Sequence, residues 1–269
     1  MAIAKTGEIS LEYYTEGSGP PLLLIMGFAG SAHSWGAPFV EQLTRNFTVT
    51  RFSNRGTGDS DKPQEQPTIR TMADDSVALL DALGIGRSHV VGISMGGMIA
   101  QEVAINHPDR VNGLVLGCTT LGRPTVVMAD AETNAAMTPD MSLPVQDIIR
   151  KSWYALVSDG FVTTGHEFLE GMIPRFLAHP TPMDSIMKQV VAIAGHNVAE
   201  RDDVIAAPTL VIHGDADRLI PPANGDQVAA KFKAELRTMP GLGHMFFWER
   251  PEESARIITE FLSRVPASA

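Results

Sequence analysis

Short runs of apolar residues recur along the chain, and helix-like stretches separate them. Most of these runs are largely apolar, which is typical of a strand buried on both faces of a parallel sheet. The predicted strands are Pro21–Ile25, Phe47–Phe52, His89–Ile93, Val111–Cys118, Thr209–His213 and Glu235–Met239. The predicted helices between and after them are Ser34–Arg45, Thr71–Leu83, Met95–Asn106 and Pro251–Arg264. Strands that alternate with helices predict an α/β fold with a mostly parallel central sheet flanked by helices.

Patterning at the two ends of the chain adds detail to this sheet. Residues 2–15 alternate loosely around Thr6-Gly7, which indicates an antiparallel hairpin at the sheet edge. The last predicted helix carries its apolar side chains on one face: Ala255, Ile258, Phe261 and Leu262. The helix from Met95 should end before Pro108, because a residue that precedes proline avoids the helical region.

The strand rhythm stops between about Leu121 and Asp202. This stretch is helix-like and is broken by prolines, among them Pro139, Pro144, Pro174, Pro180 and Pro182. It also holds six of the 13 methionines, which more often fill a core than form a binding surface. We expect residues 121–202 to form a helical cap insertion over the sheet. Residues 1–120 and 203–269 then form the core.

Composition narrows the class of protein. The net charge of −10 argues against a nucleic-acid partner, and 44% hydrophobic residues fit a globular chain. No apolar run approaches the ~18 residues of a membrane span, and the first residues lack the pattern of a signal peptide. Cys118 is the single cysteine, which excludes an intrachain disulfide and is compatible with a cytoplasmic location. The sequence gives no indication of the protein's oligomeric state.

Residues 92–97 read Gly-Ile-Ser-Met-Gly-Gly between a predicted strand and a predicted helix. A G-x-S-x-G sequence in this position forms a tight turn that exposes one hydroxyl above the sheet, here that of Ser94. Small residues must flank the serine because the backbone there is strained. The alternative is a glycine-rich turn in which Ser94 merely caps the helix.

A serine nucleophile needs a base, and the base needs an orienting group. The loops after the last two predicted strands supply both, in His213-Gly-Asp-Ala-Asp217 and in Gly241-Leu-Gly-His244. Parallel sheets place functional loops at these carboxyl ends. The order along the chain is Ser94, Asp217, His244. His213 is expected to be structural, and five histidines have no supporting context: His89, His107, His166, His179 and His196.

These motifs together resemble the α/β-hydrolase family, and the similarity runs through the chain outside the insertion. The family's H-G-x-x-D pattern implies that Asp217 rather than Asp215 is the triad acid, and G-x-x-H implies that His244 is the base. Asp215 is expected to be a turn residue. Glu249-Arg250-Pro251 also resembles the family's opening of the final helix.

The same resemblance implies an oxyanion hole built from backbone amides. Its donors would be Met95, which follows the serine, and Phe28, which follows the first parallel strand. Met26 stands where the family commonly has histidine, so the hydrogen bonds with which that histidine braces the loop are lost. Backbone donors do not depend on that side chain, and the hole can survive the change.

Two further segments bear on function. Asn54–Asp61 resembles the family segment D-x-R-G-x-G-x-S, with Ser53 in place of the aspartate, and is expected to be a charged structural turn. Gly92–Gly97 lacks the Gly-Lys-Ser/Thr ending of a phosphate loop. The sequence shows no cluster with metal-ligand spacing, and we expect no metal and no cofactor.

These expectations describe a cofactor-free serine hydrolase that cleaves a small-molecule carboxylic ester or lactone through Ser94, His244 and Asp217. The insertion would form one wall of the pocket, with apolar lining from Phe28, Trp153, Leu219, Met245 and Phe246. Fold and triad do not fix the chemistry. A cofactor-free peroxidase or carbon–carbon bond hydrolase on the same triad, and a non-catalytic ligand receptor, remain alternatives.

Overall fold

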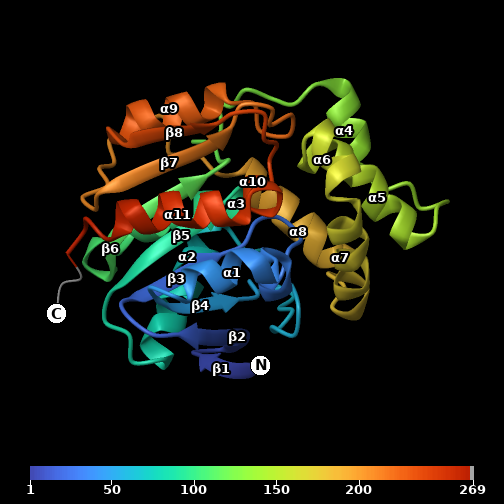
Figure 1. The fold of residues 1–269 in the computed structure, drawn as a ribbon. Coiled ribbons are helices and arrows are strands. Elements are labelled where there is room, and N and C mark those ends of the chain that lie inside the picture. The colour runs from blue at the N-terminus through green and yellow to red at the C-terminus, as the bar shows by residue number, and fades with distance from the viewer. Residues whose placement is uncertain (267–269) are drawn as a thin grey trace.

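The computed structural model describes residues 1–266. At its centre is an 8-stranded sheet in the order β1-β2-β4-β3-β5-β6-β7-β8 (Figure 1). The strands are β1 (Ala2–Thr6), β2 (Ile9–Gly17), β3 (Pro21–Ile25), β4 (Thr48–Phe52), β5 (Ser88–Ile93), β6 (Val111–Gly117), β7 (Thr209–Gly214) and β8 (Glu235–Met239). The pairs β1–β2 and β2–β4 are antiparallel, and all pairs from β4 to β8 are parallel. The predicted mostly parallel sheet with an N-terminal hairpin is confirmed.

Helices cover both faces of this sheet, which explains why β5, β6 and β7 are buried along their whole length. Successive side chains of a strand point to opposite faces. Leu22 and Leu24 of β3 therefore join the core under α1 (Ala37–Leu43) and α11 (Pro251–Leu262). Leu23 and Ile25 join the other core, under the helices α2 (Ile69–Ala82), α3 (Met95–Asn106) and α9 (Ala223–Phe232).

Helix boundaries follow local backbone chemistry. The predicted helix at 34–45 is divided at Gly36, whose φ of 74° interrupts it between η1 (Ala32–Trp35) and α1. Glycine adopts this left-handed conformation without steric cost. As predicted, α3 ends at Asn106, and η2 (Pro108–Arg110) follows. The longest helix of the described chain, α2, has 14 residues. Accordingly, none of the helices within residues 1–266 combines the length and the apolarity that a membrane crossing requires.

The stretch between β6 and β7 is helical. It contains α4 (Ala131–Met137), α5 (Val145–Leu156), α6 (Asp159–Thr164), α7 (His166–Ala178) and α8 (Met183–Ala194). Figure 1 shows α4 to α7 beyond one end of the sheet, with α8 leading back toward it. The two ends of the stretch meet, because Gly122 forms an antiparallel bridge with Asn197 and the Val198 amide donates to the Leu121 carbonyl at 3.0 Å.

Candidate active site

Ser94 lies in the sharp turn between β5 and α3, with φ 59° and ψ −123°. A positive φ is uncommon for a residue with a side chain and is found at strained functional turns. The turn also requires small neighbours. A Cβ at Gly92 would collide with the Gly96 carbonyl, and a Cβ at Gly96 would collide with the Ile25 carbonyl.

The Ser94 side chain does not cap α3, because it makes no capping hydrogen bond. Its backbone carbonyl is held instead, by the Gly97 amide at 2.9 Å and the Thr119 hydroxyl at 2.8 Å. The hydroxyl is left partly exposed and borders a cavity that His244 also borders. The turn therefore presents Ser94 to a space that a histidine shares.

Asp217 and His244 are in direct contact, as the sequence motifs implied. His244 Nδ1 lies 2.8 Å from Asp217 Oδ2, and both side chains are buried. Burial opposes ionisation of Asp217, but the charge of His244 and hydrogen bonds from His213 and His244 hold its pKa well below its usual range. Asp217 is therefore a carboxylate, so Nδ1 of His244 carries the proton that it donates. Nε2 of His244 is then free to act as a base.

The other oxygen of Asp217 is also occupied. Oδ1 accepts the backbone amides of Leu219 and Ile220, each at 2.9 Å. His213, the expected structural histidine, donates from Nε2 to the Ile220 carbonyl at 2.8 Å and lies 3.3 Å from Asp217 Oδ2. These contacts fix both carboxylate oxygens relative to the loop. Asp215 points elsewhere, because its Oδ1 accepts the Gly241 amide at 2.6 Å across the turn.

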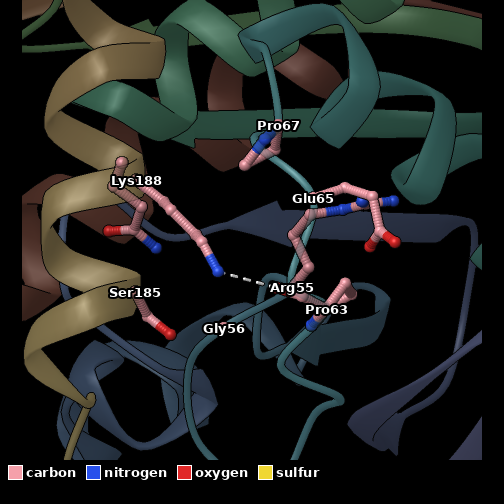
Figure 2. A pocket seen from close by; sticks show the side chains of 8 residues that line it. Arg55, Gly56, Pro63, Glu65, Pro67, Ser185 and Lys188 are labelled. Atoms are coloured by element: carbon pink, nitrogen blue, oxygen red, sulfur yellow. Dashed lines mark hydrogen bonds between the residues drawn. The ribbon is translucent and has the colours of Figure 1, made fainter.

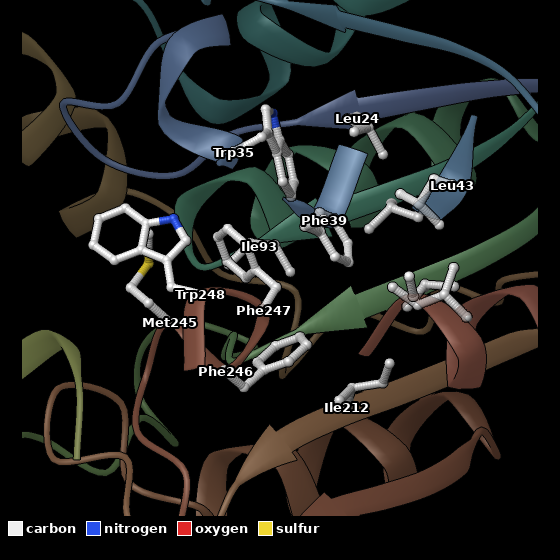
Figure 3. Close-up of a cluster of buried hydrophobic side chains, with 14 of the residues drawn as sticks. Leu24, Trp35, Phe39, Leu43, Ile93, Ile212, Met245, Phe246, Phe247 and Trp248 are labelled. Atoms are coloured by element: carbon white, nitrogen blue, oxygen red, sulfur yellow. The ribbon is translucent and has the colours of Figure 1, made fainter. Parts of the chain in front are cut away.

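The loop that carries His244 is anchored on both sides. Glu249 of α10 (Phe246–Glu249) accepts the Gly243 amide at 2.8 Å and the Ser158 amide at 3.0 Å. Directly after His244, Phe246 and Phe247 enter a buried aromatic cluster with Trp35 and Phe39 (Figure 3). The Phe247 ring centroid lies 5.2 Å from that of Trp35 and 5.3 Å from that of Phe39. The base is therefore attached to a rigid part of the core.

The two expected oxyanion donors border the same space. Within residues 1–266, neither the Phe28 amide nor the Met95 amide donates to another protein group. Met95 begins α3, so its amide has no partner inside the helix and points outward. The Phe28 turn lies against the serine, because a Cβ at Gly27 would sit 3.0 Å from the Ser94 Cβ. The side chain of Met26 is buried and borders the same cavity.

The cavity has a volume of about 310 Å³ and lies between the carboxyl ends of the strands and the helical stretch. Of the residues expected to line it, Phe28, Leu219 and Met245 do so. Two others do not. Trp153 is buried in the core with its ring edge-on to His166, and Phe246 is fully buried in the aromatic cluster. Their spacing along the chain could not distinguish core from cavity, because both environments select large apolar side chains.

Among the polar residues near this cavity that the sequence did not indicate are His179, Thr181 and Gln189. His179 and Thr181 border it, and Gln189 of α8 contacts the Phe28 turn. All three lie in the segment that carries no recognisable motif. The prolines on either side of Thr181 mark a loop there, but they do not show where the loop folds.

Two groups of side chains bring potential metal-ligand atoms within 4.8 Å of one another. In the first, Cys118 joins Asp217 and His244, but burial raises the pKa of its thiol and disfavours the thiolate that binds metals. In the second, Glu12 joins His33 and His179, whose rings are stacked 3.9 Å apart at 10°. Nitrogen lone pairs lie in the ring plane, so parallel stacked rings do not converge on one ion. Neither arrangement fits a metal as it stands.

Comparisons with known proteins agree with this geometry. A family model described as the alpha/beta hydrolase fold matches residues 20–189. A Mycobacterium tuberculosis protein, named provisionally as non-heme bromoperoxidase BpoC, is 30% identical over 96% of this chain and 100% of its own. A 2-hydroxy-6-oxononadienedioate/2-hydroxy-6-oxononatrienedioate hydrolase of Burkholderia vietnamiensis is 28% identical over 96% of this chain and 92% of that protein.

A solved structure extends the similarity to three dimensions. Est816, described as an N-acyl homoserine lactone degrading enzyme, has a TM-score of 0.78 and 28% identity, covering 97% of this chain and 100% of its own. The matched model spans the predicted nucleophile turn and more than half of the chain. The chain therefore belongs to the alpha/beta hydrolase fold family.

Proposed function

We propose that this protein hydrolyses an uncharged carboxylic ester or lactone in the cavity beside Ser94. Ser94 attacks the carbonyl carbon, and Nε2 of His244 accepts its proton. Asp217 holds the tautomer of His244 that leaves Nε2 free and stabilises the imidazolium once it forms. The amides of Phe28 and Met95 stabilise the oxyanion of the tetrahedral intermediate.

Proton return completes the cycle. The protonated His244 gives its proton to the departing alkoxide, which leaves Ser94 acylated. His244 then removes a proton from a water molecule, which attacks the acyl carbon. The bond from Ser94 Oγ to the acyl group breaks, His244 returns the proton to Oγ, and the carboxylic acid leaves. In a lactone the alkoxide and the acyl group remain in one molecule, so ring opening yields a hydroxy acid by the same steps.

The absence of charge around the cavity carries this proposal. Within the described chain, no lysine, arginine, aspartate or glutamate lines it. Most of its wall from the helical stretch is apolar and is made by Met137, Val145, Ile149, Leu156, Phe176 and Ile186, while Ser152, His179 and Thr181 add uncharged or weakly basic polar groups. His179 is the one titratable lining residue besides His244. An apolar cavity with a few polar groups at one end suits a neutral substrate with an apolar acyl or alcohol group.

The carbon–carbon bond hydrolase is the main alternative. The Burkholderia vietnamiensis relative is named for dicarboxylate substrates. A buried carboxylate needs a cationic partner or several donors, and the cavity offers no lysine or arginine among residues 1–266. The ester or lactone therefore fits this cavity better, and the structurally similar Est816 is described as degrading an N-acyl homoserine lactone. Because the Mycobacterium tuberculosis relative is named as a bromoperoxidase, the substrates tested also include those of a peroxidase.

We also propose that residues 121–202 act as a cap that determines which substrates enter, with 1–120 and 203–269 as the catalytic core. The support is that both ends of this segment meet at the Gly122–Asn197 bridge. A segment whose two ends meet beside the sheet can differ in shape between those ends without changing the strand order.

One panel of substrates tests the chemistry. It contains p-nitrophenyl esters from acetate to octanoate, acyl homoserine lactones, a dicarboxylate diketone, and bromide with peroxide and a carboxylic acid. We expect turnover of the esters or lactones, with a preference for apolar acyl chains. Turnover of the dicarboxylate alone, or of bromide alone, would overturn the proposal in favour of that alternative. A receptor would turn over none of them and would also fail to gain the mass of a serine-directed phosphonate.

A further inference from the structure

The turn that carries the Phe28 amide holds a residue in an unfavourable conformation. The Gly30 amide donates to the Gly27 carbonyl at 3.2 Å, which closes a four-residue turn. Ala29, the third residue of this turn, has a φ of 55°. A positive φ at this position alone defines a type II turn, in which glycine is the usual residue. With alanine there, flipping the peptide between Phe28 and Ala29 would relieve the strain.

Both polar groups of Ala29 are held by the helical stretch between β6 and β7. The Ala29 amide donates to Oε1 of Gln189 at 2.7 Å, and the Thr181 hydroxyl donates to the Ala29 carbonyl at 2.9 Å. Gln189 is 1% exposed, so its side chain has little freedom to turn away. The Ala29 amide belongs to the peptide that would flip. The bond to Gln189 therefore exists in the type II form and is lost in the flipped form.

We propose that Gln189, assisted by Thr181, is a positioning residue that keeps the oxyanion turn in its working conformation. This inference rests on the proposed function, in which the Phe28 amide binds the oxyanion. Gln189 does not touch the reacting atoms. It acts through the Ala29 amide, which belongs to the peptide bond directly after Phe28.

The packing of α8 explains how Gln189 is placed. Lys188 donates to the Pro63 carbonyl at 3.0 Å, and Gln66 donates to the Lys188 carbonyl at 2.9 Å. Figure 2 shows Lys188 reaching from α8 toward Pro63, across a small cavity that Gln189 also borders. A Cβ at Gly56, which also borders this cavity, would lie 3.0 Å from the Ser185 Cβ. The helix is therefore seated closely on the 54–67 loop.

This loop contains Asn54–Asp61, the segment that the sequence marked as a structural turn. Asn54 donates from Nδ2 to the Met26 carbonyl at 3.0 Å, at the start of the oxyanion turn. One loop thus contacts the turn directly through Asn54 and indirectly through α8 and Gln189. These contacts supply the bracing that the Met26 side chain cannot give, since a thioether has no proton to donate.

The test uses shape-conserving variants of the full-length protein. Gln189→Met keeps the length of the side chain but removes the strong acceptor, and Thr181→Val removes the hydroxyl. Thr181→Ser keeps the hydroxyl, so it should recover the kcat that Thr181→Val loses. Met187→Gln, on the exposed face of the same helix, is the matched control. The measurements are kcat and KM for p-nitrophenyl butyrate, melting temperature, and amide hydrogen exchange at Ala29 followed by NMR.

We expect Gln189→Met to lower kcat by about 10- to 100-fold with KM changed less than about twofold, because a misaligned donor loses part of the 10²–10³ that a whole donor supplies. Exchange at Ala29 should rise at least about tenfold while β5 amides keep their rates. Unchanged exchange at Ala29 overturns the inference, whatever the activity. Faster exchange with an unchanged kcat overturns the positioning role. If the wild type hydrolyses neither an ester nor a lactone, the proposed function fails, and faster exchange in Gln189→Met still supports the hold on the turn.

Discussion

Replacing Asp217 with asparagine changes one atom of the side chain, and the structure determines where that atom goes. Oδ1 accepts the amides of Leu219 and Ile220, so the asparagine must keep its carbonyl oxygen there. Its NH₂ group then takes the place of Oδ2, which lies 2.8 Å from Nδ1 of His244. Two donors cannot share a hydrogen bond, so Nδ1 must lose its proton and Nε2 must gain one. The histidine then presents a proton to Ser94 instead of a lone pair.

The size of the effect follows from this change of tautomer. An asparagine in place of a triad aspartate costs about 10⁴ in kcat while the geometry stays intact. The fold should tolerate the change, because both backbone bonds to Oδ1 survive. A change in unfolding free energy of ~1 kcal/mol shifts the melting temperature by roughly 2–4 °C in a protein of this size. We therefore expect a loss of activity that is far larger than the loss of stability.

Asp215→Asn is the matched control, since it makes the same chemical change two residues away. Asp215 is exposed, and an asparagine there can still accept the Gly241 amide. Its rate should stay within about twofold of the wild type. Initial rates on p-nitrophenyl butyrate and thermal unfolding of both variants decide the matter. An inactive Asp215→Asn with an active Asp217→Asn would refute the assignment of the acid, and equal activity would refute the tautomer argument.

Three further predictions concern other parts of the site. Ser94→Ala should lose several powers of ten in kcat with an unchanged melting temperature, and more than a tenth of the wild-type rate would contradict its role as nucleophile. Met26→His should lower kcat less than any triad change, because the donors are main-chain amides; a loss of about 10²–10³ would show that packing at this position controls the hole. Glu12 is fully buried, which opposes its ionisation, but hydrogen bonds from His33, Ser53 and the Asp59 amide lower its pKa from 4.5 to about 2. The carboxylate then stabilises the fold by up to about 3 kcal/mol above pH 4.5, and this stabilisation is lost as the pH falls toward 2. Melting temperatures measured across this pH range should therefore fall less steeply for Glu12→Gln than for the wild type.

The sequence was informative wherever function depends on residues that are close along the chain. The turn at Ser94 requires small residues at fixed offsets, so its shape can be recognised locally. The loop of Asp217 follows its strand within a few residues, and the loop of His244 follows the next. Contact between these two side chains could be expected because neighbouring parallel strands end at the same edge of the sheet.

Local pattern was less informative about the pocket wall. Trp153 and Leu219 both read as large apolar residues near the site, yet Leu219 lines the cavity and Trp153 packs in the core. Burial against protein and burial around a cavity demand the same hydrophobicity. Only the packing of the helices decides which side chain faces which space.

The chain by itself determined the alternation of the main strands with α1, α2, α3 and α11, the tight turn at Ser94, and the loops that carry Asp217 and His244. These follow from periodicity and from the steric demands of short segments. Only the tertiary structure decided the contacts of the Phe28 turn. Gln189 and Thr181 meet Ala29 across 160 and 152 residues of sequence, by single hydrogen bonds. A hydrogen bond requires donor and acceptor to lie within about 3 Å, and no spacing of residue types along a chain specifies such a distance between segments that only folding brings together.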